Sequence, residues 1–162
     1  PFAFEILVPI GGEEYALLAA FLKESLQKLM ITVTIQALDW DTYLVRSQEG
    51  QFHACISGWD LGLDPDPFDM FHSSQIAAGN NYVAYKNETV DRLLEEGRRE
   101  FERQKRQQIY WQVHKILHRD QPYLFAYTSM EIFILSSRIK NYKVSPYGLF
   151  EFFPGQLSWT LQ

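Results

Sequence analysis

The residues best suited to recognise another molecule lie at positions 58–72, in the sequence GWDLGLDPDPFDMFH. Trp59 is followed there by four carboxylates, those of Asp60, Asp64, Asp66 and Asp69. An aromatic face beside negative charge suits a small polar ligand with a cationic or hydrogen-bonding end. Because the segment contains no paired nucleophile and base, the sequence predicts binding there and not covalent chemistry.

The aspartates of this segment could also bind a cation. Counted from Asp64, an EF-hand would need Gly at the sixth position and Glu at the twelfth. Those positions hold Asp69 and Gln75, so the pattern departs from a calcium loop. We interpret these aspartates, with Pro65 and Pro67 between them, as turn-forming and helix-capping residues.

Three other groupings have a chemical and a structural interpretation. His114 and His118 have a spacing that can bind zinc, but the residues between them lack the Glu of the zinc-protease motif, and we expect no metal there. Cys55, the single cysteine, excludes an internal disulfide and is expected to be a small buried hydrophobe. Residues 87–89 match a glycosylation motif, but a helix cap by Asn87 accounts for them better.

Length and composition place the chain in a broad class. Its 162 residues are enough for one domain with a hydrophobic core, and 46% apolar and 22% charged residues are ordinary for a globular protein. The net charge of −5 argues against nucleic acid as the main partner. The first residue is already a proline that leads into an apolar strand, so we expect a mature fragment without a signal peptide.

The first third of the chain alternates strands and helices. Apolar and alternating segments predict strands at 4–8, 31–37 and 52–57. Apolar residues at three- and four-residue spacing predict a helix over 13–30, and a second helix begins after Asp39 and ends near Glu49. This order predicts parallel βαβ units flanked by helices.

The rest of the chain predicts helices first and strands afterwards. Asn87 should cap a helix over 88–100, and a second helix is expected over 102–119, where it should flank the sheet as the helix over 13–30 does. Apolar runs at 123–127 and 132–135 predict two more strands. The tail, 142–162, is expected to be irregular and aromatic.

An ordered set of short motifs runs along nearly the whole chain. They are Ile35-Gln36-Ala37-Leu38-Asp39-Trp40, Gly50-Gln51-Phe52-His53-Ala54, Gly58-Trp59 with Asp64-Pro65-Asp66-Pro67, Asn80-Asn81-Tyr82-Val83, Tyr85-Lys86-Asn87, Val90-Asp91-Arg92-Leu93-Leu94, Arg106, Tyr110, Ile116-Leu117 and Gln121-Pro122-Tyr123. Together they resemble the extracellular solute-binding proteins of family 5, the dipeptide- and oligopeptide-binding components of ABC importers.

The resemblance implies an α/β fold of the type II periplasmic-binding-protein kind, with a mixed, mostly parallel sheet flanked by helices. Complete members have two lobes that close around the ligand. Residues 1–125 should form most of the second, C-terminal lobe. Residues 126–162 should form a return strand and a tail that pack on the missing N-terminal lobe.

The resemblance also implies a function. The chain would belong to a non-enzymatic substrate-binding component outside the cytoplasm, in the periplasm or lipid-anchored at the cell surface. Its partners would be a small solute of the peptide type and an ABC permease in the membrane, with no nucleic acid and no cofactor. Alternatives are a nickel-chelate, haem or oligosaccharide carrier, the sensing domain of a transcription regulator, and a hydrolase that uses Asp60 or Asp64 with a histidine.

One departure from the family affects the ligand. Peptide binders of this family hold the ligand's amino group with an Asp a few residues after the Gly-Trp pair, and here Gly62 occupies that position. Either flanking carboxylate, of Asp60 or Asp64, could take that role, or the ligand could lack an amine. The expected ligand-binding residues are Trp59, Asp60, Gly62, Asp64, Asn81 and Tyr82.

Overall fold

The computed structural model describes residues 2–60, 62, 64–77, 79–130, 132–143 and 155–161. It divides the chain into two compact units, Pro1–Pro122 and Tyr123–Gln162. The first contains every element that bears on the candidate site, and each unit is described by itself.

The first unit begins with a three-stranded parallel sheet. β1 (Ala3–Pro9) lies in the centre, with β2 (Thr32–Leu38) on one side and β3 (Ala54–Cys55) on the other. β1 and β2 pair along their whole length, from Ala3 opposite Thr32 to Pro9 opposite Leu38. The predicted parallel α/β architecture is therefore confirmed, although the predicted strand 52–57 is reduced to two ladder residues.

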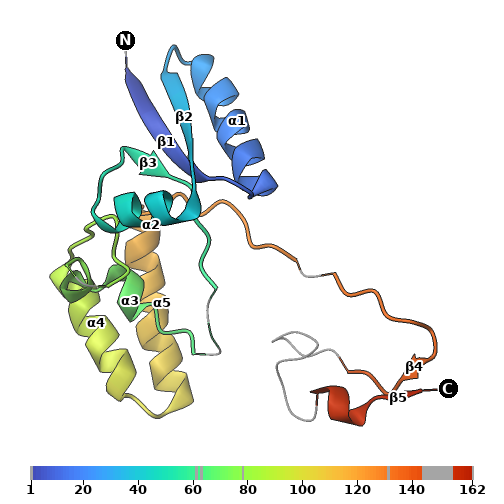
Figure 1. Cartoon of the computed structure of the whole chain (residues 1–162). Helices are drawn as coiled ribbons and strands as arrows, with labels where there is room; N and C mark the ends of the chain where they lie inside the picture. The colour runs from blue at the N-terminus through green and yellow to red at the C-terminus, as the bar shows by residue number, and fades with distance from the viewer. Residues whose placement is uncertain are drawn as a thin grey trace. The chain divides into compact units, whose positions relative to one another are not determined.

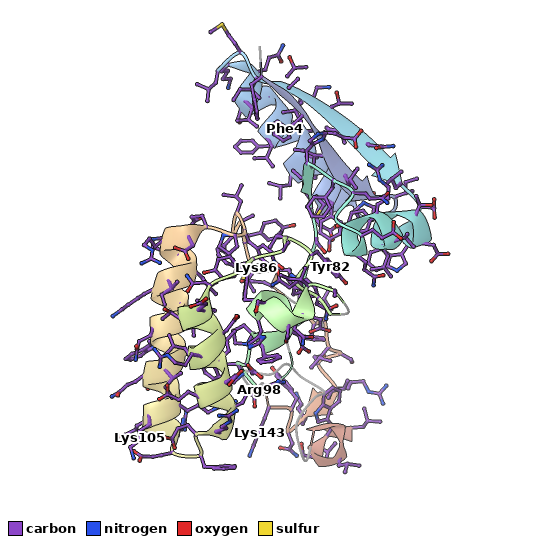
Figure 2. All side chains as sticks on the ribbon, turned by 90° about the vertical axis from the view of Figure 1, so that its left-hand side faces the viewer. Phe4, Tyr82, Lys86, Arg98, Lys105 and Lys143 are labelled. Atoms are coloured by element: carbon purple, nitrogen blue, oxygen red, sulfur yellow. The ribbon has the colours of Figure 1, made fainter. Side chains whose placement is uncertain are left out.

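The helix α1 (Glu13–Gln27) covers one face of this sheet (Figure 1). Its apolar face packs on a core of buried residues from the strands and the helix, namely Ile6, Val8, Ala19, Val33 and Ile56. Phe4, labelled in Figure 2, packs against the same core. The predicted helix ends three residues early, and Met30 adopts a left-handed conformation in the turn before β2.

The helix α2 (Trp40–Gln48) follows β2 and begins as predicted, because the Asp39 carboxylate accepts a hydrogen bond from the Thr42 amide at 3.1 Å. The chain leaves it through Gly50, whose φ of +67° favours glycine. From α2, Tyr43 is buried and donates a hydrogen bond to the carbonyl of Ile56 at 2.7 Å. This bond fastens α2 to the chain just beyond β3.

The second half of the unit is helical. A short helix α3 (Phe68–Phe71) and the 3₁₀ turn η1 (Ser73–Gln75) precede two long helices, α4 (Glu88–Arg99) and α5 (Arg103–Asp120). Asn87 caps α4 as predicted, because its side-chain oxygen accepts from the amides of Thr89 and Val90. In the part of the chain that the structure describes, no helix is long and apolar enough to span a membrane.

The helix α5 lies along α4 (Figures 1 and 2), so the prediction that residues 102–119 flank the sheet is wrong. The apolar stripe of α5 finds its partner in the neighbouring helix. A Cβ at Gly97 would lie 2.7 Å from the Tyr110 ring, so the absence of a side chain at this position lets α4 and α5 approach closely.

The second unit has little regular structure in its described residues. It contains β4 (Ile139–Lys140), a 3₁₀ turn η2 (Gly155–Ser158) and β5 (Thr160–Leu161), with β4 and β5 antiparallel. The strands predicted at 123–127 and 132–135 do not form. Their apolar side chains are mostly exposed, and neither run joins the ladder of β4 and β5 in the described part of this unit. Most of the aromatic tail, 144–154, lies outside the described residues.

Candidate functional site

The loop that follows β3 leaves the sheet at the carboxyl end of the strand, as predicted. The Ile56 amide donates to the Leu7 carbonyl at 3.0 Å, which is the last sheet-like bond before the loop. A Cβ at Gly58 would lie 2.9 Å from the Tyr15 hydroxyl, so the first turn of α1 stands beside the start of the loop. Ligands of open α/β sheets bind outside this edge, and the position favours a binding loop.

Two of the predicted site residues form an aromatic pair. The rings of Trp59 and Tyr82 are 5.6 Å apart between centroids, at an interplanar angle of 41°. Both are half-buried, so part of each ring faces solvent. The Tyr82 hydroxyl donates to the side-chain oxygen of Asn80 at 3.1 Å, which fixes the ring. Figure 2 labels Tyr82 in the segment between the sheet and the two long helices. The pair offers an aromatic surface that a planar or apolar group could contact.

The carboxylates of the loop have different surroundings. Asp64 accepts from Arg106, and Asp66 accepts from Arg98, each at 2.6 Å. Asp60 is exposed and has no ion-pair or hydrogen-bond partner among the residues that the structure describes. Gly62 is also exposed, and a Cβ there would meet nothing within 4 Å. Both carboxylates that flank Gly62 are exposed, but Asp64 is paired with Arg106, so among the described residues only that of Asp60 is left without a partner.

Asn81, another of the predicted site residues, is buried and does not lie on the surface. Its side chain is 1% exposed. The amide nitrogen donates to the carbonyls of His72 and Tyr85, at 3.2 and 2.9 Å, and the amide oxygen accepts from the Tyr85 amide at 2.9 Å. The chain's own backbone therefore uses both ends of this side chain, which closes the loop between η1 and α4.

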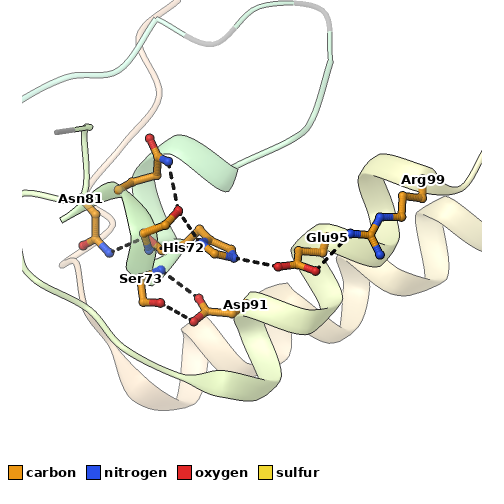
Figure 3. Close-up of polar contacts among 8 residues, drawn as sticks. His72, Ser73, Asn81, Asp91, Glu95 and Arg99 are labelled. Atoms are coloured by element: carbon orange, nitrogen blue, oxygen red, sulfur yellow. Dashed lines mark hydrogen bonds and ion pairs between the residues drawn. The ribbon is translucent and has the colours of Figure 1, made fainter. Parts of the chain in front are cut away.

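Figure 3 shows the polar network around this loop. The Ser73 amide and hydroxyl both donate to Asp91 of α4, at 2.9 and 2.5 Å. His72 accepts from the Ser74 amide through Nδ1 and directs Nε2 toward Glu95, 3.6 Å away. The network joins the segment of η1 to α4 by side chains.

The pKa shifts of ionisable groups around the site favour structural and not catalytic roles. The hydrogen bond to Asp64 raises the pKa of Arg106, which keeps this guanidinium charged. Burial raises the pKa of the Cys55 thiol, which is half-buried, and this favours the neutral form expected of a small hydrophobe. Burial also raises the pKa of Tyr43 to about 12. None of these shifts creates a nucleophile or a general base.

The metal interpretations find no geometric support in the described ranges. The carboxylates of Asp64 and Asp66 form ion pairs with arginines. His114 and His118 are exposed on α5. No group of three or more His, Cys, Asp or Glu side chains is arranged to hold an ion among the residues described.

Sequence reasoning missed the arginines that face the loop. Arg106 and Tyr110 are among the motif residues, but nothing in the sequence pairs Arg106 with a carboxylate 42 residues away. Arg98 lies in a run of mixed charges that predicts only a solvated helix face.

Known proteins that are similar to the chain indicate the kind of protein in which this loop occurs. No protein-family model matches the chain. It is 31% identical over 147 residues to the oligopeptide-binding protein AppA of Bacillus subtilis (strain 168), a match that covers 90% of this chain and 27% of AppA. The solved structure of that protein in complex with a nonapeptide matches 99% of this chain and 32% of its own, with a TM-score of 0.78 and 30% identity. In sequence and fold the chain is therefore similar to the peptide-binding components of ABC importers, the extracellular solute-binding proteins of family 5.

A second relative is named for a different solute. The chain is 34% identical over 119 residues to heme-binding protein A of Haemophilus influenzae, a match that covers 71% of this chain and 21% of that protein. The names of these relatives are those of binding proteins and not of enzymes. The chain spans about a quarter of the length of the curated relatives it matches.

Proposed function

We propose that this chain is part of the substrate-binding component of an ABC importer, which captures a peptide-like solute between two lobes and delivers it to a membrane permease. The similarity to oligopeptide- and dipeptide-binding proteins supports the solute class. The partial coverage of those relatives supports a second lobe that completes the site. Binding proteins of this kind work outside the cytoplasm, in the periplasm or anchored to the cell surface, and we propose the same location here.

The observation that carries the proposal is the pairing of Trp59 with Tyr82 beside the accessible carboxylate of Asp60. The rings would contact the solute's backbone or an apolar side chain, and Asp60 would attract its amino group. Gly62 is exposed and a Cβ there would meet nothing within 4 Å, so the loop is uncrowded at that residue. Asp64 and Asn81 would act one step away, by holding the loops that present these groups.

The proposed lobe boundary follows the compact units. We place the lobe at about residues 1–125, and the first compact unit ends at Pro122. The later residues, 126–162, would cross to the other lobe. The other lobe would then cover exposed apolar side chains of this segment, such as Ile134, and that of Leu124 just before it.

Calorimetry with peptides tests the proposal in a protein that carries both lobes. We expect a peptide with a free amino group to bind more tightly than its N-acetylated form, since only the first offers a cation to Asp60. Asp60→Asn should reduce that difference, whereas the matched variant Asp69→Asn should retain it. Trp59→Ala should weaken the binding of both peptides. Equal affinity for both peptides in the unmodified protein would exclude the amine contact, and no binding of any peptide would exclude the solute class.

Haem is the second candidate solute, because heme-binding protein A shows 34% identity to this chain. An absorption titration with haem separates the two possibilities. A saturable spectral change without peptide binding would favour haem, and peptide binding without a spectral change would favour a peptide.

A further inference from the structure

Two arginines of the α4–α5 hairpin bind carboxylates of the loop that follows β3. Arg98 Nε donates to Asp66 Oδ2, and Arg106 Nη2 donates to Asp64 Oδ1, each at 2.6 Å. The partners are 32 and 42 residues apart in the sequence, so these bonds join segments that are not neighbours in the chain. Charge-assisted bonds of this length are the strong class of hydrogen bond.

The same carboxylates also shape the loop. The Asp66 amide donates to Asp64 Oδ1, and the Phe68 amide donates to Asp66 Oδ1, both at 3.1 Å. Each bond spans a proline, which has no amide hydrogen of its own. The sequence Asp64-Pro65-Asp66-Pro67-Phe68 thus folds into two successive turns. A displacement of either arginine would release a carboxylate that also defines the backbone.

Each arginine is held by a second group that fixes its direction. Arg106 donates from Nε to the Gly97 carbonyl and from Nη2 to the Tyr110 hydroxyl, both at 3.0 Å. The Arg98 guanidinium lies 3.9 Å from the centre of the Phe68 ring. Arg98, labelled in Figure 2, comes from the last turn of α4. The planar fork of arginine makes several bonds at once, which a lysine ammonium cannot reproduce in the same geometry.

We propose that Arg98 and Arg106 are positioning residues of the solute site. They fix residues 64–68 to the helical hairpin, and so set where the preceding part of the loop presents Trp59 and Asp60. This inference rests on the proposed function, because the position of Trp59 and Asp60 affects binding only if these two side chains contact the solute. Solute affinity then depends on two ion pairs that do not touch the solute.

Hydrogen exchange measured on the whole chain tests the anchoring without any solute. We compare the double variant Arg98→Ala/Arg106→Ala with the matched double variant Arg92→Ala/Arg103→Ala. Arg92 pairs only with Glu96 of its own helix, at 3.5 Å, and Arg103 is exposed without a partner among the residues described. We expect amides of residues 58–69 to exchange about tenfold faster in the first variant and at the unmodified rate in the second. Peptides from β1 and β2 should not change in either.

A milder substitution keeps the test decisive if the double alanine variant does not fold. Arg106→Lys retains the charge and loses the fork, so exchange of the loop should lie between that of the unmodified chain and that of the double variant. Unchanged exchange in residues 58–69 would overturn the anchoring. A uniform increase over the sheet as well would do the same, because it would mean general destabilisation.

Peptide titration of the two-lobed protein then separates this inference from the proposed function. If the unmodified protein binds a peptide, the Arg98→Ala/Arg106→Ala variant should bind it at least about tenfold more weakly, and the Arg92→Ala/Arg103→Ala variant should bind it equally well. If the Arg98→Ala/Arg106→Ala variant keeps its affinity for the peptide although amides of residues 58–69 exchange faster, the positioning role is excluded. If no peptide binds the unmodified protein, the proposed function fails while the exchange result still decides the anchoring.

Discussion

Residues 3–56 pack a sheet against α1 through apolar side chains, whereas residues 64–120, which have an apolar core of their own, also attach η1 and the neighbouring loops to α4 and α5 through charged and amide groups. The loop with Trp59 and Asp60 runs from the first region to the second. Its start depends on hydrophobic burial, which salt hardly affects, and its end depends on ion pairs, which salt screens. The comparison predicts that the two ends of the loop respond to different solution conditions.

The largest effects should come from the apolar core of each region. Leu7 in β1 and Leu94 in α4 are both 0% exposed. Leu7→Ala and Leu94→Ala should each lower the free energy of unfolding by about 2–5 kcal/mol, because each leaves a cavity. Urea unfolding followed by circular dichroism measures the loss. If the regions unfold separately, hydrogen exchange should increase mainly in the region that carries the substitution, and a uniform increase would show that they unfold as one.

A smaller loss is expected from the buried amide that closes the loop between η1 and α4. Asn81→Ala removes three hydrogen bonds and takes the Asn81 partner from both the amide and the carbonyl of Tyr85, whereas the His72 carbonyl keeps its bond from the Gln75 amide. We expect a loss of about 1–3 kcal/mol in the free energy of unfolding. The neighbouring variant Asn80→Ala removes one partly exposed bond and should cost about 0.5 kcal/mol or less. Equal losses in urea unfolding would contradict the structural role of Asn81.

The two regions also differ in how well their sequences predict them. Strands and helices of the first region follow from apolar periodicity, and the caps Asp39 and Asn87 follow from local side-chain chemistry, which acts within three residues. The partners of Arg98 and Arg106 are set by the tertiary fold, so no local pattern contains them. A sequence also cannot distinguish an exposed, ligand-facing Asn81 from a buried one.

The tail shows a further limit of the sequence. Runs such as 132–135 have the composition of strands, but composition supplies no backbone partner, and these residues form none of the described strands. The strand 52–57 is short for a related reason, since its pairing with β1 ends at Cys55 and Ile56 keeps one bond to Leu7.

Two tyrosines, one in each region, sharpen the comparison at alkaline pH. The pKa values of Tyr43 and Tyr85 are both raised from 10.0 to about 12, in both cases mainly by burial, and for Tyr85 also by the neighbouring Asp120. A raised pKa stabilises the fold below pH 10, and this contribution is lost as the pH rises through about 12. Tyr43→Phe and Tyr85→Phe should each reduce the loss of stability over that interval, as measured by unfolding at a series of pH values.

Salt should distinguish these two tyrosines. Burial is the main cause at both tyrosines, but the charged neighbour that adds to the shift is the Asp120 carboxylate at Tyr85 and the half-buried Cys55 at Tyr43, so added salt should reduce the effect of Tyr85→Phe more than that of Tyr43→Phe. If both variants respond equally to salt, the two tyrosines do not differ in how much charge contributes to their pKa shifts.

The smallest effect should come from Asp120, which is exposed at the end of α5 and accepts bonds from Arg119, Tyr85 and Asn87 at 2.7–2.9 Å. The hydrogen bond from Arg119, followed by that from Tyr85, lowers the pKa of Asp120 from 3.8 to about 2. A lowered pKa of a carboxyl group stabilises the fold above pH 3.8, and the contribution is lost as the pH falls through about 2. The difference in unfolding free energy between the unmodified chain and Asp120→Asn should therefore be constant near neutral pH and shrink over that acid interval. Arg119→Ala removes the largest cause of the shift and should narrow the interval from its acid end. Because solvent and salt screen an exposed cluster, the whole effect should be smaller than that of Asn81→Ala. A difference that persists unchanged below about pH 2 would mean that Asp120 acts through its shape and hydrogen bonds and not through its charge.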